Sequence, residues 1–198
     1  MFWQNLHELD QHVTLFINGF HSPWSDQVML LFSHVRIWFP MYAVIAILFF
    51  WRLGWKKGLV TLLTCVLCVV LCDQIANLFK DGIARLRPCQ DQKMIDMGLY
   101  MLETGGGLYG FYSGHAANSF GFAVCSTMGF RNDSRLRYRG YAAFIFTWAF
   151  LVSISRIFVG KHYLGDVLTG AIAGVLIGLF CAYIGRLVIR KVPAVTRQ

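Results

Sequence analysis

The 198-residue sequence has little charge for its length. Only 14% of its residues are Asp, Glu, Lys or Arg, against 57% that are apolar or aromatic, and the mean hydropathy is +0.54. A soluble domain of this size needs a largely polar surface, so this composition argues against a soluble fold and favours a membrane protein. At about 20 apolar residues per span, the length allows five or six helices with short connections and excludes a large appended catalytic domain.

The sequence also lacks the signs of a disulfide framework and of a removable leader. Five of its six cysteines fall inside apolar runs, where we expect small packing residues rather than redox or metal chemistry. The first twenty residues carry Glu8 and Asp10, without a basic start or a small-residue cleavage site. Since no repeat, low-complexity tract or linker divides the chain, we expect a single domain over residues 1–198.

The N-terminal segment, residues 1–34, has the pattern of a helix that lies on a membrane surface. Apolar residues recur at helical spacing from Trp3 to Ile17, beside polar residues such as His7 and Gln11. A helix with this pattern has one apolar and one polar face, which is typical of an amphipathic helix in the membrane interface.

Five apolar runs follow the N-terminal segment and predict membrane spans. We therefore expect an all-α fold, a polytopic membrane helix bundle with about five transmembrane spans plus the N-terminal interfacial helix. The expected spans cover residues of about 35–51, 59–79, 116–130, 141–159 and 167–189.

Basic residues between the runs predict the orientation. They gather in the segments 52–57, 131–139 and 186–197, which fall on one side when five spans alternate. Because cytoplasmic loops are enriched in Lys and Arg, that side is predicted to be the cytoplasm. The opposite side, the exterior or periplasmic face of a bacterial-type cytoplasmic membrane, then receives the segments of about 80–115 and 156–166. We attribute the net charge of +8 to the basic segments that set the orientation of the spans, and we expect no nucleic-acid partner.

The first of three polar motifs on the predicted outer side contains two cations. Lys80 and Arg87 are seven residues apart, so we expect both on one face of a helix that ends at Pro88. Two cations on one face make an anion clamp, and interfacial snorkelling is the alternative. Asp73 should share that face, either tuning the clamp or, as we favour, forming an interhelical hydrogen bond.

The second motif is Ser113-Gly114-His115, immediately before the third span. Glycine lets a backbone approach a ligand closely, and the amides at a helix N-terminus favour negative charge. His115 would then stand at an anion site with a proton to donate. The alternative is a capping serine followed by an interfacial histidine.

The third motif is Ser155-Arg156-x5-His162-x3-Asp166. His162 and Asp166 are spaced i, i+4, so on a helix that begins by His162 the carboxylate can accept the Nδ1 proton and leave Nε2 as a directed lone pair. A nucleophilic histidine needs such a dyad. The alternative is a helix-surface pair beside a basic interfacial arginine.

Taken together, K-x6-R-P, S-G-H and S-R-x5-H-x3-D resemble the three-part signature of the type 2 phosphatidic acid phosphatase (PAP2) superfamily, which includes lipid phosphatases and vanadium haloperoxidases. The resemblance covers roughly residues 59–189, the predicted catalytic core. It implies that Lys80, Arg87 and Arg156 hold the phosphoryl oxygens, and that Ser113 and Gly114 form hydrogen bonds with the phosphate.

The resemblance also implies the catalytic roles. His162 attacks phosphorus, Asp166 orients His162, and His115 protonates the leaving group. Three fixed cations and a backbone amide stabilise a transferring phosphoryl group without a metal, so neither a metal nor another cofactor is expected.

These features predict an integral membrane phosphatase that hydrolyses a lipid phosphate or diphosphate through a phosphohistidine. Undecaprenyl diphosphate and lipid A phosphate are the leading substrates, followed by phosphatidylglycerophosphate and phosphatidic acid. A vanadate-dependent haloperoxidase and a non-enzymatic phospholipid-binding carrier are the alternatives. We expect the mobile loop over 89–109 and the N-terminal surface helix to select the lipid headgroup. The loop carries the acceptors Asp91, Asp96 and Glu103, and the alternative is that it is only a solvated connector.

Overall fold

The computed structural model of the protein describes residues 2–191, and the regular structure over this range is helical, which confirms the predicted all-α class. Arg197, counted above with the basic C-terminal segment, lies outside the described residues. The elements are α1 (Phe2–Asn18), α2 (Pro23–Ser33), the 3-10 helix η1 (Val35–Trp38), α3 (Phe39–Leu53), α4 (Trp55–Ile83), the 3-10 helix η2 (Pro88–Gln90), α5 (Gln92–Asp96), α6 (Gly114–Phe130), α7 (Arg139–Phe158) and α8 (Leu164–Lys191).

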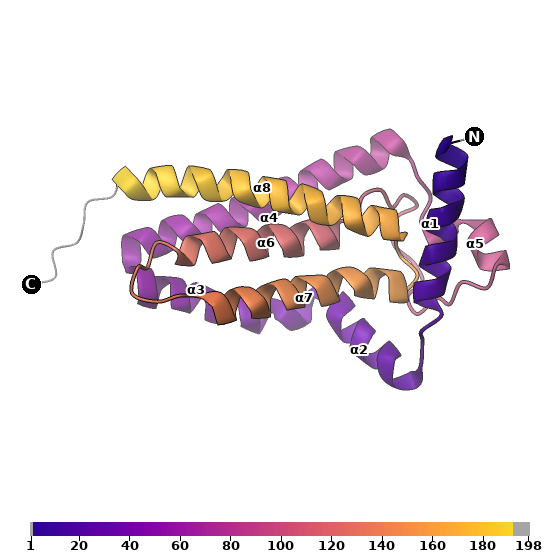
Figure 1. Ribbon diagram of the computed structural model, residues 1–198, viewed down its shortest axis with the longest axis horizontal. Coiled ribbons are helices and arrows are strands. Elements are labelled where there is room, and N and C mark those ends of the chain that lie inside the picture. Colours follow the sequence, from indigo (N-terminus) through magenta and orange to yellow (C-terminus); the bar gives the residue numbers. More distant parts are fainter. Residues whose placement is uncertain (1, 192–198) are drawn as a thin grey trace, which may run out of the picture.

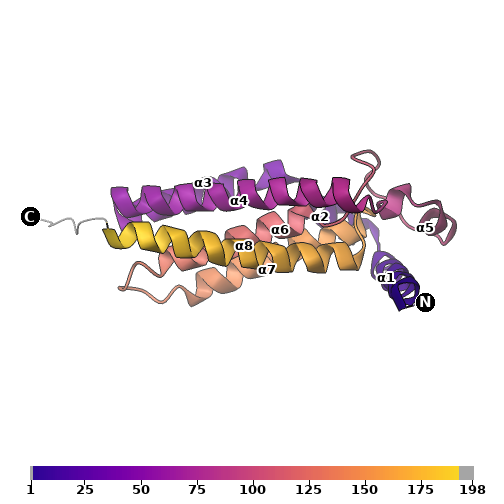
Figure 2. The same cartoon turned by 90° about the horizontal axis from the view of Figure 1, so that it is seen from above.

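Five long helices, α3, α4, α6, α7 and α8, run along the molecule, and α1 crosses one end of them (Figure 1). The view from above shows α1 and α5 beyond the same end of the bundle (Figure 2). Four stretches are long and apolar enough to cross a membrane: η1 with α3, α4, α7 and α8. These four correspond to four of the five predicted spans.

The fifth predicted span is α6, which has 17 residues and lies at the centre of the bundle. It packs against α4, α7 and α8, and most of its side chains are buried. Because protein rather than lipid surrounds it, α6 does not need the long apolar exterior of the other four helices.

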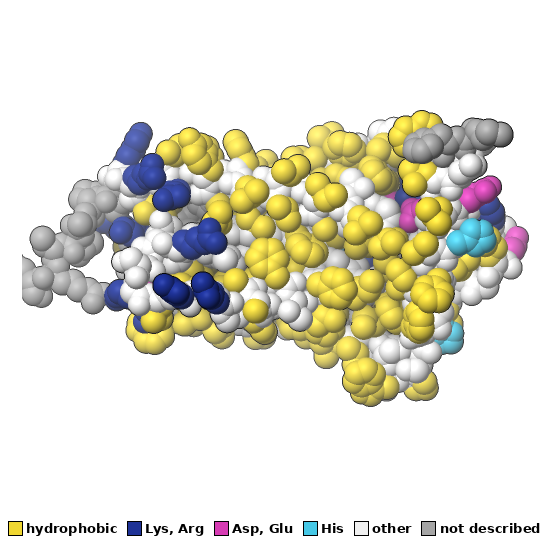
Figure 3. All heavy atoms as spheres, viewed as in Figure 1, with side chains coloured by type: hydrophobic (Ala, Val, Ile, Leu, Met, Phe, Trp, Pro, Cys, Tyr) yellow, Lys and Arg dark blue, Asp and Glu magenta, His cyan; other side chains and the backbone are white. Residues whose placement is uncertain are grey.

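Basic side chains collect at the bundle end opposite α1, and a broad apolar band covers the middle of the face shown in Figure 3. Arg52, at the end of α3, pairs with the buried Asp133 of the α6–α7 connection at 3.0 Å. The predicted common side of the basic segments is therefore one physical end of the bundle.

Glycines on α8 bring the beginnings of α6 and α8 together. A Cβ atom at Gly170 would lie 2.5 Å from the carbonyl oxygen of Ser113, and one at Gly174 would collide with the carbonyl of Ala117. Such close approach is possible only without a side chain. As a result, the Ser113 amide donates a hydrogen bond to the carbonyl of Asp166 at 3.0 Å, which joins the second and third motifs.

The cysteines of the apolar runs are packing residues, as the sequence predicted. All are free and buried in the main core where α4, α6 and α8 meet. They are Cys65, Cys68, Cys72, Cys125 and Cys181.

The N-terminal helix α1 is amphipathic, but part of its polar face is buried against protein. Thr14 accepts a hydrogen bond from the Leu164 amide at 3.0 Å, and Asn18 donates one to the carbonyl of Ile157 at 3.1 Å. The apolar face points outward through Trp3, Leu6, Leu9 and Phe16. Helix α1 therefore fastens the α7–α8 connection while it presents an apolar surface to its surroundings.

Candidate active site

The first motif is built differently from the prediction. Helix α4 ends at Ile83 rather than at Pro88, and Ala84 takes a left-handed conformation with φ 52°. The residue before a proline avoids helical geometry, so Arg87 is extended, with φ −71° and ψ 153°. Lys80 remains in the last turn of α4, and the expectation of one shared helix face was wrong.

Arg87 reaches the site next to an isolated antiparallel bridge between Leu86 and Tyr109. Its amide donates to the carbonyl of Leu108 at 3.1 Å, and its guanidinium Nε donates to the carbonyl of Tyr109 at 3.1 Å. Gly110 packs closely between the first and third motifs. A Cβ atom there would lie 3.1 Å from Arg87 Cγ and 3.2 Å from Asp166 Oδ2.

The second motif begins α6. Ser113 is the N-cap residue, and its hydroxyl accepts a hydrogen bond from the Ala116 amide at 3.4 Å. Gly114 and His115 follow in the first turn, where unpaired helix amides favour an anion. The capping serine, which was the alternative interpretation of this motif, is thus present. It orients the N-terminal end of α6 toward the cavity described below.

The third motif spans the α7–α8 connection. Arg156 lies in the last turn of α7, and its carbonyl accepts a hydrogen bond from the His162 amide at 3.2 Å. Helix α8 begins at Leu164, two residues after His162, so the dyad joins a loop residue to the first helical turn. His162 Nδ1 lies 3.5 Å from Asp166 Oδ2, longer than a good hydrogen bond, and such contacts often tighten when substrate binds.

His162 is uncharged at neutral pH in this environment. Burial lowers its pKa to about 4, and the Arg156 and Arg87 charges act in the same direction, whereas Asp166 raises it. Only the neutral imidazole has the lone pair needed to attack phosphorus. With Nδ1 facing Asp166, the nitrogen left for attack is Nε2.

One cavity of about 560 Å³ joins the motifs. It continues from the motif residues along α3, α4, α6 and α7, past apolar side chains that include Tyr42, Phe49, Val66 and Phe122. Ser113 and Asp166 are buried and do not line it. The six predicted site residues that do are Lys80, Arg87, Gly114, His115, Arg156 and His162.

Asp73 also lines this cavity, and its hydrogen bond lies within α4. Its carboxylate accepts from the Asn77 side chain at 3.4 Å, and Asn77 accepts from the Lys80 ammonium at 3.0 Å. The sequence analysis favoured an interhelical hydrogen bond for Asp73. That prediction was wrong for the described part of the chain. Asp73 instead acts on the first cation of the motif through Asn77.

Ser33, which sequence reasoning missed, and Glu103, which was expected to contact the headgroup, both lie against Arg156. Arg156 is 4% exposed, and its Nη1 lies 3.6 Å from Glu103 Oε2 and donates to the Ser33 hydroxyl. Ser33 in turn donates to Glu103 Oε1. The Glu103 carboxylate is thus the ion-pair partner of Arg156.

The loop over 89–109 is packed rather than loose. Met94 and Leu99 form a small core with Tyr163, and the buried Lys161 ammonium donates to the carbonyl of Gly105. The glycine run that the sequence predicted to be mobile is therefore tied to the residue before His162.

The acidic side chains of that loop have different partners. Asp91 caps α5 and accepts from the Tyr163 hydroxyl at 2.7 Å, and Asp96 accepts from Gln92 at 2.8 Å. Of the three acidic residues expected to contact the headgroup, only Glu103 reaches the site.

A second missed residue is Arg85, inside the first motif. Its guanidinium pairs with Asp166 Oδ1 at 2.7 Å and with Asp10 Oδ2 of α1 at 2.7 Å. Asp10 is one of several polar residues on an amphipathic helix, so no signal in the sequence pointed to this contact. No cluster of three His, Cys, Asp or Glu side chains suited to a metal ion occurs between residues 2 and 191.

Known proteins resemble this chain in sequence and in fold. The sequence profile of the PAP2 superfamily matches residues 58–190. The lipid A 4'-phosphatase of Bacteroides thetaiotaomicron is 38% identical over 171 residues, covering 85% of this chain and 73% of that protein. The lipid A 4'-phosphatase of Porphyromonas gingivalis is 30% identical over 174 residues, covering 87% and 71%.

Two crystal structures share the fold. The PAP2-type phosphatidylglycerolphosphate phosphatase of Bacillus subtilis has a TM-score of 0.70 at 19% identity, covering 96% of this chain and 89% of that one. Aquifex aeolicus LpxE has a TM-score of 0.65 at 21% identity, covering 87% and 93%. At these identities the likeness concerns the fold alone.

Proposed function

Because this chain belongs to the PAP2 superfamily, a family of phosphatases, we propose that it removes phosphate from lipid A at the outer face of the cytoplasmic membrane. The chain is a membrane lipid phosphate phosphatase, and the two lipid A 4'-phosphatases at 38% and 30% identity favour lipid A among the lipid phosphates. The observation that carries the proposal is the single cavity in which the phosphate-binding cations and an apolar groove meet.

The shape of that cavity suits an amphiphile. A phosphate held by Lys80, Arg87 and Arg156 would place the rest of the molecule at the start of the groove between α3 and α4. The apolar walls stabilise acyl chains, whereas a soluble phosphate ester would be bound only through its phosphate. The substrate is therefore a lipid whose headgroup is bound while its tails extend toward the bilayer.

The three cations supply the electrostatic part of catalysis. In phosphoryl transfer the negative charge spreads over the equatorial oxygens, and fixed positive groups stabilise it without reorganising. Arg156 is held in place by Ser33, and Arg87 by the carbonyl of Tyr109. Glu103 must give up Arg156 when the phosphate enters.

The histidines carry the bond changes. His162 Nε2 attacks phosphorus, the bond from phosphorus to the lipid oxygen breaks, and His115 donates its proton to that oxygen. Asp166 stabilises the positive charge that develops on the His162 ring. Water then attacks the phosphohistidine, His115 takes a proton from it, and inorganic phosphate leaves with His162 restored.

Phosphate release from purified lipids in detergent micelles tests the substrate. The panel holds lipid A phosphorylated at both ends, its two monophosphates, undecaprenyl diphosphate, phosphatidylglycerophosphate and phosphatidic acid. We expect kcat/KM for a lipid A form to exceed the others by about tenfold or more, since only groups beyond the shared phosphate can discriminate.

The same panel separates the alternatives. Turnover should persist in EDTA and be inhibited by vanadate. A faster rate on undecaprenyl diphosphate would contradict the lipid A assignment, binding without phosphate release would indicate a carrier, and halide oxidation by the vanadate-loaded protein would indicate a haloperoxidase.

We further propose that the site faces the exterior, because the site and the basic segments lie at opposite ends of the bundle. Reporters fused after Lys57, Arg139 and Arg190 should give a cytoplasmic signal, and a cysteine placed at the exposed Lys93 should react with an impermeant maleimide added outside intact cells. Labelling of Lys93→Cys only after lysis would place the site in the cytoplasm.

A further inference from the structure

Arg85 bridges two carboxylates that come from distant parts of the chain. Its Nη1 donates to Asp166 Oδ1 and its Nη2 to Asp10 Oδ2, each at 2.7 Å. The guanidinium also lies over the ring of Tyr163, 3.9 Å from the centroid, and 3.2 Å from His7 Nδ1. A planar fork with donors on two edges can hold two carboxylates at once, which an ammonium group does less well.

The contact with Asp166 determines which way that carboxylate points. Asp166 is fully buried, and its Oδ2 accepts from the Tyr163 amide at 3.1 Å while facing His162. Without Arg85, Oδ1 would be a buried anionic oxygen with no partner in the described structure, which is costly enough to rotate the group or draw in water. Arg85 therefore keeps Oδ2 directed at the nucleophile.

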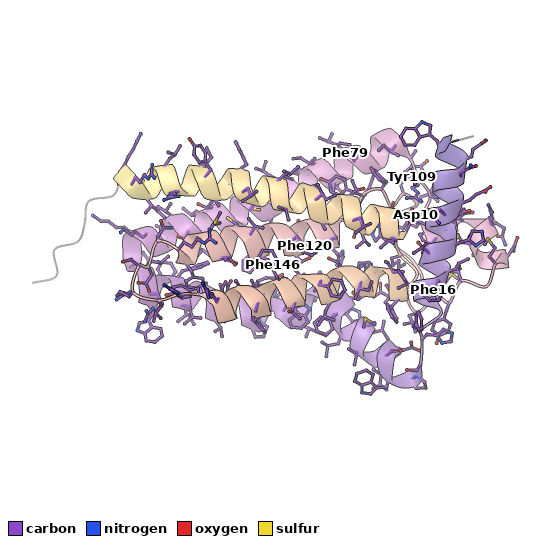
Figure 4. All side chains as sticks on the ribbon, viewed as in Figure 1. Asp10, Phe16, Phe79, Tyr109, Phe120 and Phe146 are labelled. Atoms are coloured by element: carbon purple, nitrogen blue, oxygen red, sulfur yellow. The ribbon has the colours of Figure 1, made fainter. Side chains whose placement is uncertain are left out.

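Asp10 holds Arg85 and the start of α8 together. Its Oδ1 accepts a hydrogen bond from the Gly165 amide at 2.8 Å, one residue before Asp166, and its Oδ2 is the oxygen paired with Arg85. Figure 4 shows Asp10 where α1 passes the beginning of α8. Each carboxylate thus fixes one edge of the guanidinium.

We propose that Arg85 is a positioning residue for the His162–Asp166 dyad, and that Asp10 of the N-terminal helix holds Arg85 for this task. The inference rests on the proposed function only in taking His162 as the nucleophile. It makes α1 part of the construction of the active site, not merely a membrane contact.

The test compares Arg85→Gln with Arg52→Gln. Arg52 is a matched control, because it also pairs with a buried carboxylate, Asp133, but at the other end of the bundle. Misplacing a reacting group by about 1 Å can cost roughly 10²-fold in rate, so we expect Arg85→Gln to lower kcat by about that factor. KM should change little, since the phosphate-binding cations remain, and Arg52→Gln should leave kcat near the wild-type value.

The pH profile gives a readout that a purely structural role would not move. Loss of the guanidinium removes a positive charge that lies 2.7 Å from Asp166 Oδ1, so the positive field at the dyad falls. The pKa of His162 should then rise from about 4 toward its ordinary value, and the acidic limb of kcat/KM should move to higher pH. The charged and titratable groups that face the dyad are Arg85, Asp10, His7, Tyr163, Arg87, Arg156 and His115.

Two further variants keep the proposal testable if Arg85→Gln folds poorly. Arg85→Lys retains the charge and should recover part of the lost kcat. Asp10→Asn keeps an acceptor for the Gly165 amide but loses the ion pair, so it should lower kcat less than Arg85→Gln. The double variant should be no slower than Arg85→Gln, because both changes act through one contact.

The rates are measured on the panel lipid that the wild type hydrolyses fastest, so a wrong choice of lipid A does not affect the comparison. The proposal is overturned if Arg85→Gln and Arg52→Gln lose kcat equally, if the acidic limb stays in place, or if the losses from Asp10→Asn and Arg85→Gln multiply.

Discussion

Alanine at His162, the proposed nucleophile, is expected to lower kcat by roughly 10⁶-fold, because no imidazole would remain to form the bond to phosphorus. The side chain is buried and lines the cavity together with Arg87 and Arg156, with one ring nitrogen facing Asp166 and the other left for the cavity. Water admitted in its place would lack both the basicity and the position of an imidazole. Phosphate release from the fastest panel lipid measures the loss. After a basic quench, the wild type should carry a phosphoryl label that is stable in base and lost in acid, and its absence from the variant would show that no phosphohistidine forms.

Asp166→Asn is the matched variant for that experiment. It removes the charge that stabilises the imidazolium while keeping the side-chain shape, so a loss of about 10⁴-fold with residual turnover is expected. A His162→Ala protein that retains turnover comparable to that of Asp166→Asn would exclude the phosphohistidine route and require direct attack by water.

The second and third motifs could be predicted from the sequence because each is formed by residues that are close together in the chain. His162 and Asp166 are four residues apart, and Ser113 to His115 are consecutive, so the chain itself brings them together. The helix order and the common end of the basic loops likewise follow from apolar run length and charge. Meeting of the second and third motifs needed a tertiary condition, the close α6–α8 contact at Gly170 and Gly174. Arg87 of the first motif needed another, the pairing of its amide with the carbonyl of Leu108.

The contacts that sequence reasoning missed are between residues far apart in the chain. Arg85 and Asp10 are 75 residues apart, and Ser33 and Arg156 are 123 apart. Their spacing carries no periodic signal, and each side chain taken alone fits an interfacial position. The helix end at Ile83 was missed for a related reason, because the pairing of Leu86 with Tyr109 across the loop draws the chain out of helix before Pro88.

The second large effect is expected at Arg156. Alanine there should lower kcat by about 10³-fold or more, the range seen when an arginine that stabilises a transferring phosphoryl group is removed. Because every candidate lipid presents the same phosphoryl oxygens to Arg156, the loss should be similar for lipid A phosphate, undecaprenyl diphosphate and phosphatidic acid. Initial rates across the panel measure it.

A structural explanation for the same loss is that Arg156→Ala leaves the Glu103 carboxylate without its partner. Glu103→Gln is the control, because it breaks the same ion pair from the other side while it leaves the guanidinium in the cavity. If Arg156 acts on the phosphate, Glu103→Gln should keep kcat and bind vanadate more tightly, since the competing carboxylate is gone. Equal losses of kcat in the two variants would mean that the pair serves the fold, and that Lys80 and Arg87 carry the phosphoryl charge without Arg156.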